Sequence, residues 1–272
     1  MEKGRLPEEM AGLLARVRDS RPLVHCITNY VAANDSANIL LAIGASPIMA
    51  DCSAEAAEIA AQADGILLNL GIPNPDKARA MRFAGETANR LHKPLVFDPV
   101  GAGASTFRKE TSAALLKAVR VQIIRGNAGE MRALCGMQTT SEGVDAVKPD
   151  SCAEALAKTV AEEYGCIAAI TGETDVITDG ERTVRLLNGH PILSSLTGSG
   201  CMASAITAAF AAVSDDPLVA ACAGVSFMGI CGELAAAYST LAGGFHTALF
   251  DAAGAMTAEC FLDRLRLMNE PD

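Results

Sequence analysis

The segment Leu196–Ser204 places two glycines and one cysteine directly ahead of a long stretch of small residues with helical spacing. Gly198 and Gly200 carry no Cβ atom, so the backbone at these positions can approach a ligand closely. A helix that begins here would point its free N–H groups and the positive end of its dipole at that ligand, an arrangement that suits a phosphate group. The predicted anion hole consists of Gly198, Ser199, Gly200 and Cys201.

Two carboxylates follow predicted strands elsewhere in the chain and could hold Mg²⁺ near a transferring phosphate. Asp98 comes directly after Leu95–Phe97, and Glu130 comes shortly after Val121–Ile124. Carboxylate oxygens are ligands that Mg²⁺ prefers. Each residue also has a structural alternative: Asp98 could cap a turn or helix, and Glu130 could complete a capping box with Asn127. Both roles are compatible for Glu130, which could reach a metal through water.

Other predicted strand ends supply candidates for binding a nucleotide and a substrate. Arg125 could stabilise phosphate charge, and Thr171, which follows Ile167–Ile170, could offer its hydroxyl to a nucleotide. A plain β-turn explains the Thr171 segment equally well. Asn29 ends the first predicted strand and could contact a polar substrate. Met49 lies near another strand end, where a methionine more often fills the core.

Three familiar arrangements are excluded by the residues themselves. His25 and Cys26 are adjacent in a predicted strand, so their side chains point to opposite faces and cannot form a nucleophile–base pair. No lysine follows a glycine, so the chain has no P-loop motif. The turn at Gly101–Gly103 lacks the third glycine of a dinucleotide-binding motif, because position 106 is Thr.

Strands and helices must position these side chains. The sequence predicts them as short β-rich runs that alternate with segments of helical apolar spacing. Strands are expected at Leu23–Ile27, Pro47–Met49, Gly65–Leu68, Leu95–Phe97, Val121–Ile124 and Ile167–Ile170. Helices are expected over 30–43, 53–62, 76–91, 106–118, 127–135 and 152–164. Strands that alternate with helices and lack internal polar alternation indicate a parallel sheet covered on both faces. Ligands bind such a sheet beyond the carboxyl ends of its strands.

The second half of the chain is predicted to add an edge hairpin and three helices. The runs 176–178 and 183–187 flank Asp179 and Gly180, a pair typical of a tight hairpin turn. Helices are then expected over about 200–213, 217–237 and 245–267. The charge-free run Leu218–Gly232 is shorter than the roughly 20 residues of a membrane span and is predicted to be a buried core helix. The polar segment 137–151 is either a functional flap or a plain surface loop.

Composition narrows the class of protein and its partners. The 22 basic and 32 acidic residues give a net charge of −10, without a basic run, so neither nucleic acid nor an anionic membrane is an expected partner. Half of the 272 residues are hydrophobic and no low-complexity linker interrupts them, so residues 1–272 are expected to form a single domain. The nine cysteines form no CxxC pair, and the N-terminus has no signal-peptide pattern; a cytoplasmic location is expected.

Together these segments resemble the hydroxyethylthiazole kinase family of the ribokinase-like superfamily. The resemblance covers most of the chain and rests on the order and spacing of His25–Asn29, 38–50, Asp98–Gly103, Arg125–Glu130, Thr171–Asp175, Asn188–Pro191 and Thr197–Cys201. It implies a three-layer α/β/α fold with a mostly parallel central sheet. It also implies that ATP and Mg²⁺ are used to phosphorylate the alcohol of 4-methyl-5-(2-hydroxyethyl)thiazole, a step of thiamine salvage.

The resemblance also implies roles for individual residues and an oligomeric state. It implies Cys201 beside the attacking hydroxyl, Met49 and Gly198 at the thiazole, Arg125 and Thr171 at ATP, and Asp98 and Glu130 at the metal. Asn29 and Asn127 are further candidates for binding the substrate and ATP, respectively. A homotrimer with sites between subunits is implied, so that Met49 would serve a neighbour's site. Two departures from the family pattern, at Ile72 and in Ser194–Leu196, leave the carboxylates and the anion hole intact.

The cysteine at position 201 separates this chain from most ribokinase-like enzymes, which carry an aspartate as general base there. A thiol accepts a proton only as thiolate, with an ordinary pKa of about 8.5. We expect the helix N-terminus to lower that pKa and the nearby phosphate charge to raise it. Base catalysis should therefore be modest, with most acceleration from positioning and charge stabilisation. Cys201 disfavours three alternatives: a hydroxymethylpyrimidine or pyridoxal kinase, and an ATP-dependent NAD(P)H-hydrate dehydratase. A nucleotide sensor without turnover is the non-enzyme alternative.

Overall fold

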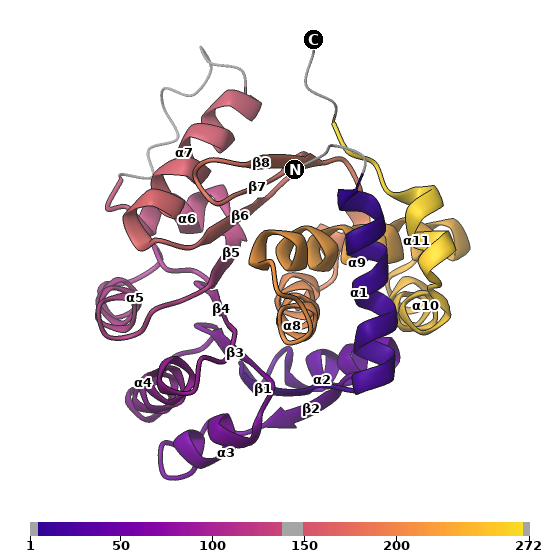
Figure 1. Cartoon of the computed structure of the whole chain (residues 1–272). Helices are drawn as coiled ribbons and strands as arrows, with labels where there is room; N and C mark the ends of the chain where they lie inside the picture. The colour runs from indigo at the N-terminus through magenta and orange to yellow at the C-terminus, as the bar shows by residue number, and fades with distance from the viewer. Residues whose placement is uncertain (1–4, 138–148, 269–272) are drawn as a thin grey trace.

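The computed structural model describes residues 5–137 and 149–268, which contain an eight-stranded sheet with helices on both faces (Figure 1). The strand order is β2-β1-β3-β4-β5-β6-β7-β8. The strands are β1 Leu23–Ile27, β2 Ser46–Met49, β3 Gly65–Asn69, β4 Leu95–Asp98, β5 Ile123–Asn127, β6 Ile167–Thr171, β7 Asp175–Thr178 and β8 Thr183–Leu186. The pairs among β1 to β6 are parallel, and β7 and β8 continue the sheet antiparallel. The predicted three-layer fold and edge hairpin are confirmed.

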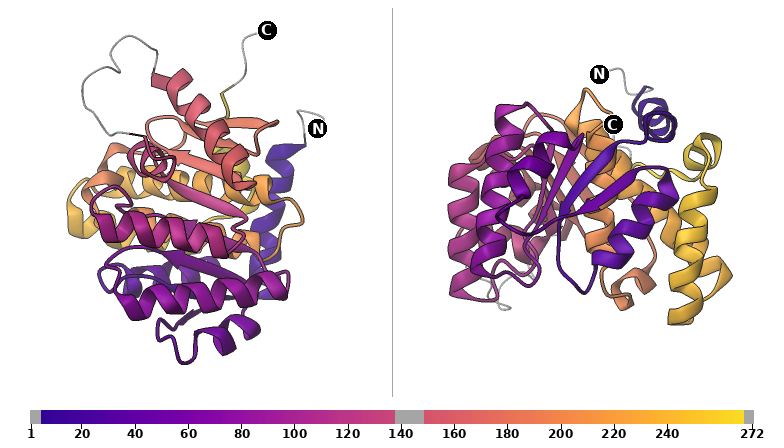
Figure 2. Two further views of the ribbon diagram at one scale, coloured as in Figure 1. Left: turned by 90° about the vertical axis from the view of Figure 1, so that its left-hand side faces the viewer. Right: turned by 90° about the horizontal axis from the view of Figure 1, so that it is seen from below.

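Each face of the sheet has its own layer of helices (Figure 2). Each face also has its own hydrophobic cluster. One face is covered by α3 Ala56–Gln62, α4 Pro75–Arg90, α5 Thr106–Ala118, α6 Ala128–Leu134 and α7 Pro149–Tyr164. The other is covered by α1 Leu6–Ser20, α2 Ala33–Ile43, α8 Ser199–Ala211, α9 Pro217–Tyr238, α10 Ala242–Ala255 and α11 Ala258–Arg264. Val24 and Cys26 of β1 belong to the α8 side and Ile27 to the α4 side, as alternating strand residues should. Thus His25 and Cys26 do not share a face.

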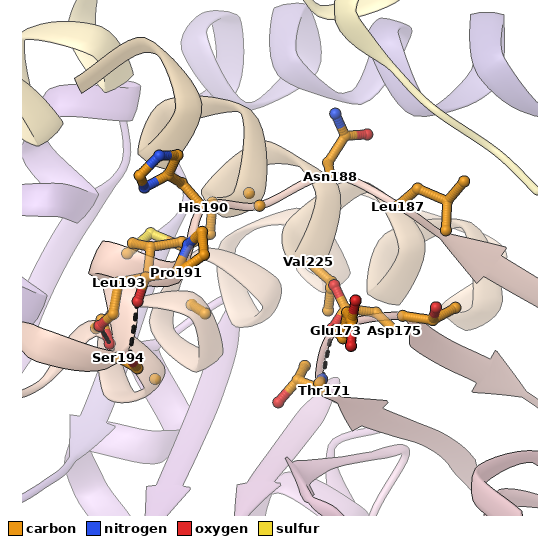
Figure 3. Close-up of a pocket in the computed structure, with 18 of the residues that line it drawn as sticks. Thr171, Glu173, Asp175, Leu187, Asn188, His190, Pro191, Leu193, Ser194 and Val225 are labelled. Atoms are coloured by element: carbon orange, nitrogen blue, oxygen red, sulfur yellow. Dashed lines mark hydrogen bonds between the residues drawn. The ribbon is translucent and has the colours of Figure 1, made fainter. Parts of the chain in front are cut away.

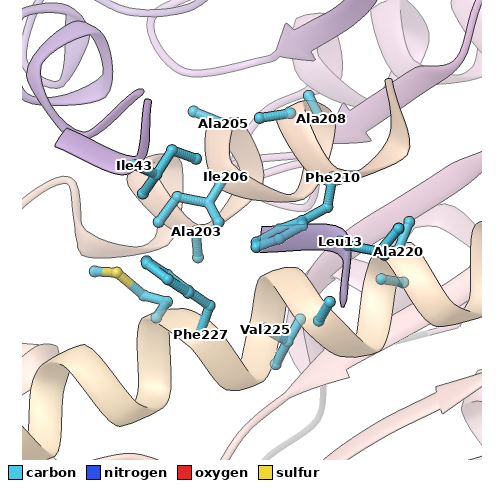
Figure 4. Packing of buried hydrophobic residues seen from close by; sticks show 14 of the residues in the cluster. Leu13, Ile43, Ala203, Ala205, Ile206, Ala208, Phe210, Ala220, Val225 and Phe227 are labelled. Carbon is cyan, nitrogen blue, oxygen red and sulfur yellow. The ribbon is translucent and has the colours of Figure 1, made fainter. Parts of the chain in front are cut away.

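Helices α8 and α9 form the centre of the larger cluster. Phe210 and Phe227 meet edge to face with ring centroids 5.8 Å apart (Figure 4). The backbones of α8 and α9 approach closely at Gly224, where a Cβ atom would lie only 2.4 Å from Thr207 Oγ1. Helix α9 is long and apolar enough to cross a membrane by length and composition, but 89% of its most apolar window is buried inside the structure. The prediction of a core helix over this run is therefore confirmed.

Several elements differ from the sequence prediction. Helix α1 was not predicted, although Pro7 and acidic residues mark its first turn. The single helix expected over 245–267 is two helices, because the chain leaves helical geometry at Met256 and Thr257 caps α11 by accepting from Cys260 N. Strand β5 extends to Asn127 rather than ending at 124, because its last residues pair with β6. Of the segment 137–151, where a flap or a surface loop was expected, residues 138–148 lie outside the described residues and 149–151 belong to α7.

The parallel strands bring their carboxyl ends to one edge of the sheet. Asn69, which ends β3, pairs with Asp98, which ends β4. Asn127 of β5 pairs with Thr171 of β6 in the same way. Polar residues that are far apart in the sequence therefore become neighbours at this edge, and α8 begins beside them.

Candidate active site

The turn that leads into α8 has the geometry of an anion site. Gly198 adopts a left-handed conformation, with φ of 87°, which favours glycine. Ser199 Oγ donates to Leu193 O at 2.8 Å, which fixes the turn. The N–H groups of Gly200 and Cys201 donate no hydrogen bond to the described residues. Two free donors at the start of a thirteen-residue helix support the predicted anion hole.

Cys201 lies at the rim of this turn with 9% of its surface exposed. Its Sγ accepts from Asn69 Nδ2 at 3.3 Å and from Asn29 Nδ2 at 3.5 Å. Burial, and then the negative charge of Asp98, raise the pKa of the thiol above its ordinary value. The amide donors and Arg125 lower the pKa by less. The helix N-terminus and a bound phosphate were expected to shift this pKa in opposite directions; burial of the sulfur, a third effect, raises it.

Asn69 connects the residues around Cys201 and was not predicted as a site residue. It is fully buried, and its Nδ2 donates to Asp98 Oδ2 at 2.8 Å as well as to the Cys201 sulfur. Its Oδ1 accepts from Asn29 Nδ2 at 3.0 Å and from Gly71 N at 2.9 Å. The rule that selected Asn29, a polar residue at the end of a buried strand, applies equally to Asn69 and could have found it.

A buried lysine joins the two loops that carry this amide cluster. Lys77 Nζ donates to the carbonyl oxygen of Thr28, which directly precedes Asn29. It also donates to the carbonyl oxygen of Gly71, which lies shortly after Asn69. Burial lowers the pKa of Lys77. The ammonium group thus connects the end of β1 to the end of β3 at the point where both amides face the sulfur.

Asp98 is buried and belongs to the same cluster. Its Oδ2 accepts from Asn69 Nδ2 and from Ser204 Oγ, each at 2.8 Å. Burial raises the pKa of Asp98 to about 7, and of the two nearby charges Arg125 lowers it while Glu130 adds to the increase. Within residues 5–137 and 149–268, Asp98 Oδ1 accepts no hydrogen bond, and Asp98 caps neither a turn nor a helix. One carboxylate oxygen is therefore available to a cation or a water molecule.

Glu130 performs the capping role that the sequence offered as an alternative. Asn127 Oδ1 accepts from Glu130 N at 2.9 Å, and Glu130 Oε2 accepts from Asn127 N at 2.8 Å, which completes a capping box. Glu130 Oε1 accepts from Gly101 N at 2.9 Å. Among the described residues, no three His, Cys, Asp or Glu side chains come together as a metal site. Asp98 Oδ1 nevertheless remains available, and Glu130 lies close enough to Asp98 to raise its pKa. This arrangement fits Mg²⁺, which binds through one or two carboxylates, its own waters and substrate phosphates.

Arg125 links the turn to the neighbouring strand. Its Nη1 donates to Gly200 O and its Nη2 donates to Thr171 Oγ1, both at 3.0 Å. Its Nε is buried without a hydrogen-bond partner in the described residues. The guanidinium is thus fixed between the N-terminus of α8 and the end of β6, with a donor still unused.

A pocket of about 850 Å³ opens next to Arg125 and Thr171 (Figure 3). Its other walls are the turn Gly172–Asp175, the segments Leu187–Pro191 and Leu193–Ser194, the α9 residues Val225, Met228 and Gly229, and the start of α8 at Ser199, Gly200 and Ala203. Asp175 is buried, accepts from Gly172 N at 2.9 Å, and has a pKa raised to about 6 by burial. This volume lies in the range of sites for small molecules and cofactors.

Met49 lies apart from this pocket. It ends the edge strand β2, which β1 and β3 separate from β4 and Asp98. Its side chain is 38% exposed and does not line the pocket. Asn127 is likewise outside the pocket lining, because its side chain caps α6.

Comparison with known proteins decides the family. The model of the hydroxyethylthiazole kinase family matches residues 14–259. The chain is 45% identical to a hydroxyethylthiazole kinase of Clostridium beijerinckii, over 92% of this chain and 93% of that protein. It is 42% identical to one of Ruminiclostridium cellulolyticum, over 96% and 97% of the two chains. The chain belongs to the hydroxyethylthiazole kinase family.

Solved structures agree with this membership of the hydroxyethylthiazole kinase family. The hydroxyethylthiazole kinase of Pyrococcus horikoshii superposes with a TM-score of 0.88 at 39% identity, covering 95% of this chain and 98% of that one. A pyridoxal kinase and an ADP/ATP-dependent NAD(P)H-hydrate dehydratase, both of Bacillus subtilis, match at 16% and 14% identity with TM-scores of 0.60 and 0.56. These two share the fold alone.

Within this member of the hydroxyethylthiazole kinase family, the predicted residues fall into distinct groups. Asn29, Asp98 and Cys201 meet in one buried cluster through Asn69. A second group lies at the turn and the pocket and consists of Gly198, Ser199, Gly200, Arg125 and Thr171. A third group is the capping box of Asn127 and Glu130. Met49 joins none of these three groups within one chain.

Proposed function

We propose that this protein transfers the γ-phosphoryl group of ATP to the hydroxyl of 4-methyl-5-(2-hydroxyethyl)thiazole, and so acts in thiamine salvage. The observation that carries the proposal is the junction at α8, where free N–H groups of the turn lie between the Cys201 cluster and the pocket beside Arg125 and Thr171. A phosphoryl acceptor and a nucleotide can therefore meet at one anion site. The named relatives support the same reaction.

The residues of the chain divide the work in the following way. ATP occupies the pocket with its phosphates toward the turn, where the N–H groups of Gly200 and Cys201 receive the transferring group. Arg125, held by Gly200 O and Thr171 Oγ1, offsets the negative charge that develops during transfer. When bound, Mg²⁺ neutralises phosphate charge, and Asp98 and Glu130 are the residues that would hold it.

The acceptor hydroxyl lies beside Cys201 and Asn29 in this proposal. The raised pKa of Cys201 leaves little thiolate near neutral pH, so the thiol is a weak proton acceptor. Catalysis therefore depends chiefly on how well the hydroxyl and phosphate are aligned. The buried amides of Asn29 and Asn69 fix the sulfur and thereby the side of the site that the hydroxyl enters.

We further propose a cytoplasmic homotrimer in which each chain, residues 1–272, is a single domain and Met49 contributes to a neighbour's thiazole site. Met49 pairs with Cys26 at the carboxyl ends of β1 and β2, and the residues that follow β1 include the exposed Tyr30 and Val31. Tyr30 and Val31 are 80% and 50% exposed, and large exposed apolar residues near Met49 in the chain order of the sheet are what a subunit contact would cover. Nine free thiols fit a reducing compartment.

The decisive experiment mixes the purified protein with Mg²⁺, ATP and the thiazole alcohol and follows the products by phosphorus NMR and mass spectrometry. We expect a new phosphate monoester in proportion to ADP. Binding of ATP and the alcohol without turnover would instead identify a sensor. Activity only on hydroxymethylpyrimidine, pyridoxal or hydrated nicotinamide nucleotides would replace the proposed substrate.

A further inference from the structure

The pocket wall formed by Leu187–Pro191 is held from behind by contacts that the proposed chemistry does not use. Asn188 is buried, and its side chain points away from Thr171 and Asp175 on the opposite wall (Figure 3). Its Nδ2 donates to Glu233 Oε1 at 3.1 Å and to Arg264 O at 2.8 Å. Asn188 therefore contributes its backbone to the pocket and its amide to an anchor outside it.

Glu233, near the end of α9, is the centre of this anchor. Besides the Asn188 amide, its Oε1 accepts from Gly189 N at 2.7 Å and from Arg266 Nη2 at 2.6 Å. Its side chain is only 14% exposed. A partly buried carboxylate oxygen with three donors fixes their relative positions, because charge-assisted hydrogen bonds are stronger than neutral ones.

The segment that follows α11 completes the anchor. Asn188 Oδ1 accepts from Arg266 N at 2.8 Å, and Leu187 N donates to Arg266 O at 2.9 Å. Leu186 and Leu267 form an antiparallel bridge, which extends the edge of the sheet beyond β8. The last described residues of the chain are thus paired with the strand that leads into the pocket wall.

The backbone of the segment Leu187–Pro191 also packs directly against α9, the helix that carries Glu233. The carbonyl oxygen of Asn188 packs against α9 at Gly229, where a Cβ atom would lie 2.7 Å from it. The wall can therefore neither approach α9 further nor withdraw from it without breaking the contacts of Glu233. Its position determines the width of the pocket on that side.

We propose that Glu233 is a positioning residue for nucleotide binding, and that it acts through Asn188 and Gly189 together with the chain segment after α11. The inference rests on the proposed function in one respect, namely that ATP occupies this pocket. Glu233 does not touch the pocket itself. The Cys201 cluster shares no hydrogen bond with the Glu233 anchor in the described residues, so the effect should fall on the nucleotide and spare the acceptor alcohol.

The test compares Glu233→Ala and Glu233→Gln with the wild type and with Asp216→Ala as matched control. Asp216 caps the opposite end of the same helix, where its Oδ1 accepts from Leu218 N at 2.9 Å, and it pairs with Arg182. Calorimetry gives the Kd for ADP without turnover, and steady-state kinetics give KM for ATP, KM for the alcohol and kcat. Melting temperatures report on general destabilisation.

For Glu233→Ala we expect Kd for ADP and KM for ATP to rise about tenfold, the loss expected for charged hydrogen bonds, with kcat and KM for the alcohol unchanged. Glu233→Gln keeps an acceptor oxygen without the charge, so we expect a smaller increase of about threefold. Asp216→Ala should lower the melting temperature and leave Kd for ADP unchanged.

Three results would overturn the inference: an unchanged Kd for ADP in Glu233→Gln, an equal increase in KM for both substrates, or the same loss of ADP binding in Asp216→Ala. If Glu233→Ala does not fold, Glu233→Gln decides alone. A wild type that binds ADP but phosphorylates no alcohol, with weakened ADP binding in both Glu233 variants, would support the positioning role while the proposed function fails.

Discussion

The two halves of the proposed site, named here for the ligands we propose that they bind, are built by different means. The acceptor half, comprising Asn29, Asn69, Asp98 and Cys201, is buried, and its side chains contact one another directly. The nucleotide half, comprising Arg125, 171–175 and 187–191, lines an open pocket and is held largely through backbone groups and anchors outside it. The chemistry is thus fixed by side-chain contacts, whereas the shape of the nucleotide pocket is fixed by chain segments. Substitutions in the two halves should therefore fail in different ways.

Burial of a carboxyl group lowers the free energy of unfolding more in the acceptor half, at Asp98, than in the nucleotide half, at Asp175. Asp98 has an ordinary pKa of 3.8 and a folded-state pKa of about 7, so its ionisation opposes folding. The cost is absent while Asp98 is protonated in both states, grows as the pH rises from about 4 to about 7, and then stays constant. A buried carboxylate kept at such a cost points to function rather than to stability.

The largest expected effect separates function from stability at Asp98. Asp98→Asn removes the charge and keeps the shape, so we expect kcat to fall by about a hundredfold to a thousandfold. In metal-free buffer the variant should be more stable than the wild type at pH 8, and the difference should shrink as the pH falls toward 4, because the wild-type carboxyl then becomes neutral. Turnover assays and denaturant unfolding at several pH values measure the two quantities. A variant less stable than the wild type at pH 8 would refute the proposed cost of burial.

The next effect tests whether the acceptor half works as one unit. Asn69→Leu preserves volume but removes the hydrogen bonds to Asp98, Cys201 and Asn29. We expect kcat to fall by about tenfold to a hundredfold, while Kd for ADP stays at the wild-type value. Glu233→Ala should give the opposite pattern, and melting curves of both variants control for misfolding. If Asn69→Leu weakens ADP binding as much as it lowers kcat, the two halves are not separable.

A smaller effect is expected from exchanging the weak base of the acceptor half. Cys201→Asp places a carboxylate where the thiol has a raised pKa, so the variant should keep or exceed wild-type activity near neutral pH. The wild-type kcat should rise with pH on the alkaline side as the thiolate forms, and the aspartate variant should lose that rise. The measurement is kcat against pH for both proteins. A folded but inactive variant would remove the proposed role of Cys201.

The smallest effect concerns backbone strain next to the acceptor half. Ile72 has φ of 49°, a left-handed conformation that is costly for a β-branched residue, and it belongs to neither hydrophobic cluster. Asparagine tolerates this conformation, so Ile72→Asn should raise the free energy of unfolding by about 1 kcal/mol. Thermal unfolding measures the change, and turnover of the alcohol reports whether the strain serves the site. A lowered melting temperature would mean that the Ile72 side chain stabilises more than its backbone costs.

Local signals in the sequence sufficed for the elements and for many of the site residues. Apolar runs and helical spacing predicted the six parallel strands and the hairpin, because burial on two faces leaves a clear composition. The rule that ligands bind beyond strand ends selected Asn29, Asp98, Arg125 and Thr171. The capping box of Asn127 and Glu130 was also readable, because its partners are three residues apart.

Contacts between distant segments were decided only by the tertiary structure. Asn69 is 132 residues from Cys201, and Asn188 is 45 residues from Glu233, so no local pattern relates either pair. The pKa of Cys201 also escaped the sequence, because a helix N-terminus is a local feature whereas the burial that outweighs it comes from elements packed around the sulfur. Local physics thus set which residues stand at strand and helix ends. Packing set which of them touch, how deeply they are buried, and hence what charge they carry.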